Sequence, residues 1–253
     1  MRILSASITV QDVAKAARFY RETLQLPVEE TPSRAVVTAG SSRLVLTAGG
    51  RFDGVHHLAF GIPPSDFGLA REWLAERVPL LLSGGSDVIV SSAAWSSRSL
   101  YFPGPEGIIL EFIARDADAA AAPSAGPGPR VLSISEVGIG VADVLGAVAQ
   151  ISRELAVPVF HDLSGTFASM GSHDGLLIIV HEDRIWFPTA DSRPARGPLA
   201  VDIASTADNV RIDLGQGVSV AGRQLPAGTP AAGDSATIRN LGYGTGAPRG
   251  AGS

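Results

Sequence analysis

The protein has 253 residues, of which 45% are hydrophobic and 18% charged, and its formal net charge at pH 7 is −5. This length can bury a sizeable core in one or two domains, and no lysine and arginine cluster indicates a nucleic-acid partner. The chain contains no cysteine, which excludes disulfides, thiolate metal sites and cysteine nucleophiles. No apolar run approaches the roughly 20 residues that cross a bilayer, and no signal peptide is recognisable. We therefore expect a cytoplasmic protein without a membrane partner.

The first predicted elements are a short strand that ends near Asp12 and a helix that begins there. The Asp12 carboxylate suits a helix N-cap because it can accept hydrogen bonds from the first free backbone N–H groups. Apolar side chains then recur at helical spacing, at Val13, Ala16, Ala17, Tyr20 and Leu24. The helix should end before Pro27, where further strands begin.

The same order of elements recurs in the next part of the chain. The segment HHLAFGI, residues 56–62, has the pattern of a strand, and residues 63–78 have that of a helix. Three strand-like runs follow, DVIVSS, SRSLYF and GIILEFI. Each of these two modules is therefore predicted to be a strand, a helix and three strands.

The first module is repeated in the second half of the sequence. Residues 8–28 align without a gap on residues 139–159, and Ile, Val, Asp, Val, Ala, Leu, Pro and Val recur at a constant offset of 131. Asp143 repeats the N-cap position of Asp12. Such a fixed offset indicates a duplicated unit. Residues 199–201 align on residues 58–60, but no convincing helix follows them, so the fourth module is expected to be degenerate.

Composition divides the chain near its middle. Residues 116–130 are rich in alanine, proline and glycine and have no periodic apolar pattern, which is typical of a linker. We expect an N-terminal domain over residues 1–115, a C-terminal domain over residues 131–245 and a flexible tail over residues 246–253.

The run SITVQDVAKAARFYRETLQLPV, together with YFPGPEGIILEFI, resembles the vicinal-oxygen-chelate superfamily. That superfamily includes glyoxalases, bleomycin-resistance proteins, extradiol dioxygenases and fosfomycin-resistance enzymes. The resemblance covers residues 2–182. It implies an α+β fold of tandem βαβββ modules, with two domains of paired modules whose curved sheets enclose a pocket. In metal-using members, the first strand and a glutamate on the last strand of each module supply the ligands, and the ion holds two neighbouring substrate oxygens.

In the second module the resemblance places its two ligand positions at His57 and Glu111. An imidazole and a carboxylate suit a divalent ion such as Zn, Fe, Mn or Ni. His56 should point to the opposite face of the sheet, because successive side chains of a strand alternate. His57 and Glu111 are therefore the predicted metal ligands.

The other modules depart from the ligand pattern. Module one has Ser5 and Leu46 at the two positions, module three has Glu136 and Ile179, and module four has Pro198 where module two has His57. This incomplete ligand set favours a pocket that works without metal and weighs against a two-domain extradiol dioxygenase.

Glu136 needs a partner, since a carboxylate on an otherwise apolar strand is costly to bury alone. His181 lies two residues beyond Ile179 and should share its face. We predict a hydrogen bond between Glu136 and His181, which serves either as a catalytic acid/base pair or as a structural contact.

Two functional hypotheses follow. In the first, the protein is a glyoxalase/bleomycin-resistance/dioxygenase-superfamily member that binds a small oxygenated organic molecule without metal. In the second, it is a metal-dependent lyase, isomerase or ring-cleaving dioxygenase that uses His57 and Glu111. The sequence does not specify the substrate, because one fold hosts many chemistries. Either a monomer or a homodimer is compatible with four modules in one chain.

Overall fold

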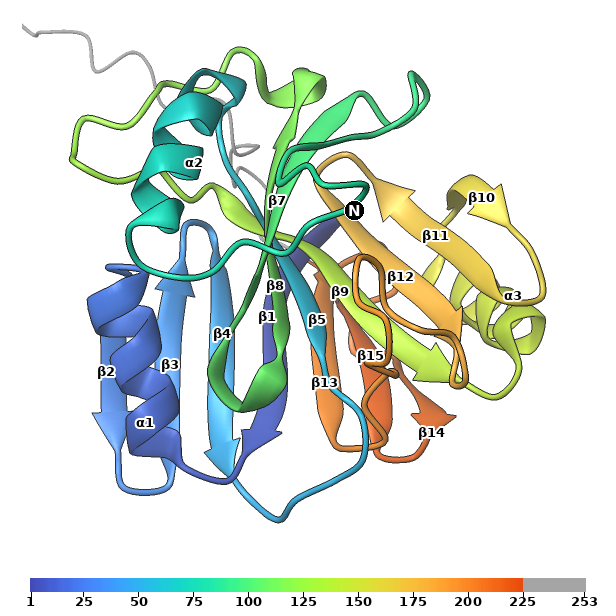
Figure 1. The fold of residues 1–253 in the computed structure, drawn as a ribbon. Helices are drawn as coiled ribbons and strands as arrows, with labels where there is room; N and C mark the ends of the chain where they lie inside the picture. Colours follow the sequence, from blue (N-terminus) through green and yellow to red (C-terminus); the bar gives the residue numbers. More distant parts are fainter. Residues whose placement is uncertain (225–253) are drawn as a thin grey trace, which may run out of the picture.

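The computed structural model describes residues 1–224, so the predicted tail and the last part of the predicted C-terminal domain lie outside the described residues. Across this range the strands form one seven-stranded and one eight-stranded mixed sheet (Figure 1). No helix among these residues is long and apolar enough to cross a membrane.

The seven-stranded sheet has the order β14-β15-β13-β1-β4-β3-β2. Its strands are β1 (Arg2–Val10), β2 (Val28–Thr31), β3 (Arg34–Ala39), β4 (Ser42–Ala48), β13 (Leu199–Ala204), β14 (Arg211–Gly215) and β15 (Val218–Arg223).

The eight-stranded sheet has the order β10-β11-β12-β9-β5-β8-β7-β6. Its strands are β5 (His57–Gly61), β6 (Ile89–Val90), β7 (Ser97–Pro103), β8 (Ile109–Arg115), β9 (Ser133–Val141), β10 (Val159–Leu163), β11 (Phe167–Ser172) and β12 (Gly175–His181).

Three α-helices accompany the sheets in the described chain: α1 (Val13–Arg18), α2 (Phe67–Ala75) and α3 (Val144–Leu155). The predicted N-caps of α1 and α3 are confirmed, because Asp12 accepts from the backbone N–H of Lys15 and Asp143 from that of Gly146. A π-helical turn over Phe19–Thr23 continues α1. In Figure 1, α1 lies beside β2 and β3, while α3 lies beside β10–β12.

The βαβββ order predicted for the first three modules is confirmed. The fourth module contributes β13, β14 and β15, and no helix separates β13 from β14. The modules do not pair within each half as the sequence analysis expected, because each sheet takes strands from both sides of residues 116–130. Module one pairs with module four through β1 and β13, and module two pairs with module three through β5 and β9.

The main hydrophobic core lies between the two sheets, where β1 and β4 contact β9. The Ser42 side chain, which is buried, joins the sheets. Its hydroxyl donates to the carbonyl of Ile3 at 2.7 Å and accepts from the N–H of Ile134 at 3.0 Å. One face of each sheet is thus buried against the other sheet, and the opposite face of the eight-stranded sheet is left to form a cavity.

The segment predicted as a linker is held against α2. The Asp66 carboxylate is buried and accepts from the backbone N–H groups of Ser124, at 3.0 and 3.1 Å, and Arg130, at 2.9 Å. Gly128 lies so close to the Trp73 indole that an added Cβ would come within 2.9 Å of the ring.

We expect Asp66→Ala to lower the free energy of unfolding by roughly 2–3 kcal/mol, because charge-assisted hydrogen bonds to two backbone N–H groups are lost. Urea denaturation measures the change. Asp87→Ala is the matched control, since it removes an ion pair with Arg71 whose guanidinium is half exposed, and should cost less than about 1 kcal/mol. Equal losses in the two variants would contradict the anchoring role of Asp66.

Candidate functional site

Three ionisable side chains meet on one face of the eight-stranded sheet because of the strand register. Ala59 on β5 pairs with Glu111 on β8 and, on its other side, with Glu136 on β9. The two carboxylates therefore flank Ala59 and share its face. His57 lies two residues earlier on β5 and points the same way, since side chains alternate along a strand.

We call His57, Glu111 and Glu136 the ligand cluster. One potential ligand atom from each residue lies within 4.8 Å of those of the other two, and all three side chains are buried. The His57 Nδ1 lies 3.3 Å from the carbonyl oxygen of Ile109. A carbonyl can only accept, so Nδ1 carries the proton and the Nε2 lone pair is directed into the site, 3.5 Å from Glu111 Oε2.

Burial governs the protonation of His57 and Glu111. Burial lowers the pKa of His57 below its usual 6.5, so this imidazole is neutral near pH 7. Burial, and secondarily the nearby Glu136, raises the pKa of Glu111 to about 8. Glu111 also accepts hydrogen bonds from Ser99 and Tyr101. Its Oε2 atom is buried without a hydrogen-bond partner in the described part of the chain.

Glu136 is held by a buried ion pair with Arg115, the last residue of β8. Arg115 also donates from Nε to the hydroxyl of Ser135 at 3.3 Å. Arg115 is not among the site residues predicted from the sequence. The sequence signal that could have identified it is its position, because Arg115 is a lone arginine at the end of the apolar run of β8.

A cavity of about 250 Å³ opens over the ligand cluster. Aromatic side chains form much of its wall. The Trp186 ring lies 5.2 Å from the His57 ring and the Tyr101 ring lies 6.1 Å from it, between centroids. The Trp186 indole N–H donates to the carbonyl of Val55 at 3.1 Å, which fixes the ring. Such a cavity fits a small molecule with a flat or apolar body.

The predicted hydrogen bond between Glu136 and His181 does not form. On β12, Leu176 pairs with Glu136, and the cavity-facing residue beyond it is Ile178 rather than Ile179. His181 shares the opposite face with Ile179, and its Nδ1 accepts from the backbone N–H of Asp183 at 3.2 Å. The prediction was wrong by one residue along β12, and a shift of one residue moves a side chain to the opposite face of the sheet.

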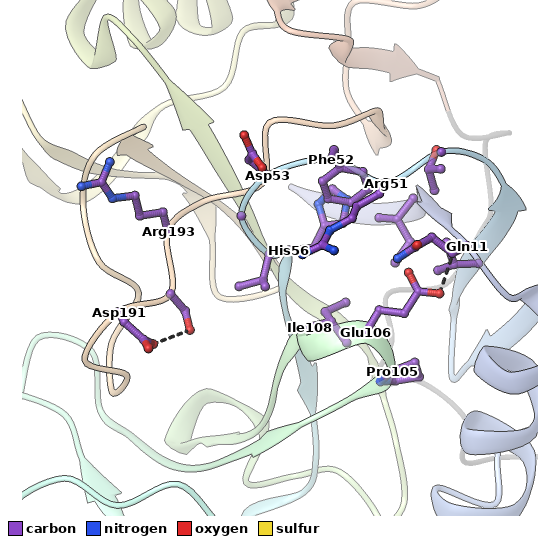
Figure 2. Close-up of a pocket in the computed structure, with 17 residues that line it drawn as sticks. Gln11, Arg51, Phe52, Asp53, His56, Pro105, Glu106, Ile108, Asp191 and Arg193 are labelled. Carbon is purple, nitrogen blue, oxygen red and sulfur yellow. Dashed lines mark hydrogen bonds between the residues drawn. The ribbon is translucent and has the colours of Figure 1, made fainter.

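The two adjacent histidines face different cavities. His57 faces the cavity over the ligand cluster, whereas His56 lines a separate cleft of about 560 Å³. Figure 2 shows this cleft with Arg51, Phe52 and His56 between Gln11 and Glu106 on one side and Asp191 and Arg193 on the other. The His56 ring packs edge-on against Phe52, with centroids 5.1 Å apart. Burial lowers its pKa to about 4.

The sheet that carries β1 offers no comparable set of ligands among residues 1–224. The Ser5 hydroxyl, at the first ligand position of module one, donates to the Asp202 carboxylate at 2.9 Å. Leu46, at the second position, is fully buried in the main core. The departures noted in the sequence therefore leave a single ligand cluster in the described chain.

Gly138 on β9 leaves room for the cavity wall. A Cβ at this position would lie 2.5 Å from the Trp186 ring and 3.0 Å from the Cβ of His57. We expect Gly138→Ala to displace Trp186, to shift the tryptophan fluorescence to longer wavelength and to cost roughly 1–3 kcal/mol of stability. Gly68→Ala is the control, because an added Cβ there meets nothing within 4 Å. An unshifted spectrum in Gly138→Ala would show that Trp186 does not depend on this glycine.

The fold is similar to several solved structures. A protein of Bacillus subtilis to which dioxygenase activity is ascribed superposes with a TM-score of 0.60 at 12% identity, over 92% of this chain and 87% of that one. Glyoxalase I of Zea mays superposes with a TM-score of 0.51 at 15% identity, over 79% and 74%. Its V278E variant gives 0.50 at 17% identity, over the same shares.

No protein-family model and no curated protein matches the sequence. The structural matches nevertheless extend over both sheets and agree with the βαβββ order of the modules. The chain therefore has the fold of the vicinal-oxygen-chelate superfamily.

Proposed function

We propose that the protein is a divalent-metal-dependent enzyme of the lyase or isomerase type that acts on a small oxygenated organic molecule. The observation that supports this most directly is the ligand cluster, in which three buried potential ligand atoms lie within 4.8 Å of one another. Glu136 adds a third ligand to the His57 and Glu111 pair. Three protein ligands and open positions are typical of catalytic rather than structural metal sites.

The donor atoms fit such an ion. His57 is neutral and offers an Nε2 lone pair, because its Nδ1 proton is committed to Ile109. Glu111 offers an oxygen atom that is buried and has no other described partner. One nitrogen and two carboxylate oxygens suit Zn, Mn, Fe or Ni.

A divalent ion bound by the ligand cluster would polarise two neighbouring oxygens of a substrate and stabilise the enolate or oxyanion that forms. The surrounding residues would orient the substrate, limit access of water and support the ligands. Trp186 and Tyr101 would orient the body of the substrate beside His57, and the buried position of the cluster would limit access of bulk water. The Tyr101 and Ser99 hydroxyls would hold Glu111 in place.

The composition of the ligand cluster favours lyase or isomerase chemistry over oxygenase chemistry. Non-haem iron oxygenases use two histidines and one carboxylate, whereas this cluster has one histidine and two carboxylates. Glyoxalase I of Zea mays, a structural neighbour of this chain, has a name that fits this class.

A second candidate is a pocket protein that binds its ligand without metal. The ion pair of Glu136 with Arg115, and the hydrogen bonds of Glu111 to Ser99 and Tyr101, give both carboxylates partners in the absence of an ion. This candidate predicts a cavity that binds small molecules equally well in the presence of a chelator.

Metal content separates the two candidates. The protein would be incubated in turn with Zn, Mn, Fe(II) and Ni, desalted and measured by plasma mass spectrometry. We expect about one ion per chain for at least one of these metals. No bound metal in any sample would overturn the metal-dependent proposal. Oxygen uptake with catechol, measured on the loaded protein, would instead indicate a dioxygenase.

A further inference from the structure

Arg115 is a fully buried cation beside the ligand cluster. Only 1% of its side chain is exposed. One terminal nitrogen pairs with Glu136, Nε donates to Ser135, and the other terminal nitrogen is buried without a hydrogen-bond partner among the described residues. The guanidinium carbon lies 5.9 Å from the centre of the Trp95 ring.

This placement is energetically demanding. Removing a guanidinium from water costs several kcal/mol unless a carboxylate compensates its charge. Glu136 supplies that carboxylate, yet Glu136 is also one of the three potential ligands in the cluster. In a loaded site, Glu136 would thus contact two cations, the Arg115 guanidinium and the divalent ion. Each cation would weaken the bond between Glu136 and the other cation.

The charge count of the site shows what Arg115 changes. Two ionised glutamates neutralise a divalent ion, so without Arg115 the loaded site would be neutral. With Arg115 the loaded site carries one net positive charge in a buried environment, where charges interact strongly. One negative charge on a chelating molecule restores neutrality.

We infer that Arg115 is a positioning residue that acts as the internal counter-ion of Glu136, weakening capture of the divalent ion while strengthening binding of a singly charged, two-oxygen chelating substrate. This inference rests on the proposed function. It adds one property to the two-oxygen substrate of that proposal, which is a single negative charge.

Arg115→Gln tests the inference with two readouts that should move in opposite directions. In calorimetric titrations of metal-free protein with Zn²⁺ or Mn²⁺, the variant should bind the ion roughly tenfold more tightly than the native protein. In titrations of the loaded protein with acetohydroxamate, a two-oxygen chelator that binds as a monoanion, the variant should bind roughly tenfold more weakly.

Two matched variants isolate the role of charge. Arg115→Lys keeps the positive charge and should stay within about threefold of the native protein in both titrations. Arg71→Gln removes an arginine whose pairing with Asp87 lies away from the site, and it should change neither affinity. A purely structural role for Arg115 would weaken binding of both ion and chelator in Arg115→Gln.

The outcomes distinguish the inference from the proposed function. If the native protein binds no divalent ion, the proposed function fails. If it binds the ion but Arg115→Gln binds it no more tightly, or binds acetohydroxamate unchanged, the counter-ion role of Arg115 is wrong. Arg115→Gln could also be unfolded when it is metal-free. The inference then requires that the divalent ion restores the fold, because the ion compensates the negative charge of Glu136. Failure to refold with the ion also overturns the inference.

Discussion

Replacing His57 with alanine or Glu111 with glutamine should weaken binding of a divalent ion roughly 100-fold or more, whereas His56→Ala should leave it within about threefold of the native value. Loss of a partner that orients a metal-ligating histidine already costs 10–100-fold in metal affinity, so loss of a ligand itself should reach or exceed this range. Isothermal titration of metal-free protein with Zn²⁺ or Mn²⁺ measures all three variants.

His56→Ala is a close control for His57→Ala, because the two residues are adjacent and both are buried. They differ in the cavity they face, since His56 lines the larger cleft and His57 the cavity over the ligand cluster. Equal losses in both variants would point to general damage at the start of β5 rather than to loss of a ligand. Unchanged affinity in Glu111→Gln would remove that residue from the site.

The second large effect concerns the pH dependence of stability in the metal-free protein. The pKa of Glu111 is raised from 4.5 to about 8 in the folded protein, first by burial and second by Glu136. Between these pH values the folded state binds more protons than the unfolded state. The contribution of Glu111 to the free energy of unfolding is therefore fully present below about pH 4.5 and falls as pH rises towards 8. The loss should be on the order of a few kcal/mol.

Urea denaturation in the presence of a chelator, at intervals from pH 5 to pH 8.5, measures this effect. The native protein should lose stability relative to Glu111→Gln as pH rises, because glutamine cannot ionise. The comparison also removes the opposite contribution of His56, whose lowered pKa favours stability as pH rises from about 4 to 6.5. Parallel curves for the two proteins would show that Glu111 ionises normally in the fold.

The repeated elements of the fold were predictable from local sequence signals. Asp12 and Asp143 stand at equivalent positions of an ungapped repeat, and both cap helices. Alternation along a strand predicts opposite directions for His56 and His57, and the cavities that the two residues line agree with this. These features depend on neighbours within a few residues, which a single sequence contains.

Long-range pairing was not predictable in the same way. Glu136 joins His57 and Glu111 because β9 pairs with β5, and the apolar patterns of these strands are equally compatible with other partners. From the sequence, Glu136 was therefore placed in module three, apart from His57 and Glu111, and paired with His181. Arg115 was missed for a related reason. Its carboxylate partner lies 21 positions away on β9, which β5 separates from β8, and only the strand register brings the two together.

The pairing of β1 with β13 has a consequence for synthesis of the protein in the cell. Arg2 lies opposite Ala204. One edge of β1 therefore stays unpaired until the ribosome has made β13, about 200 residues later. At 5–20 residues per second the delay is about 10–40 s. During this time the nascent chain presents an unpaired strand edge, the kind of surface that recruits other strands. Chaperone protection of β1 would therefore matter more for this chain than for one whose halves close independently.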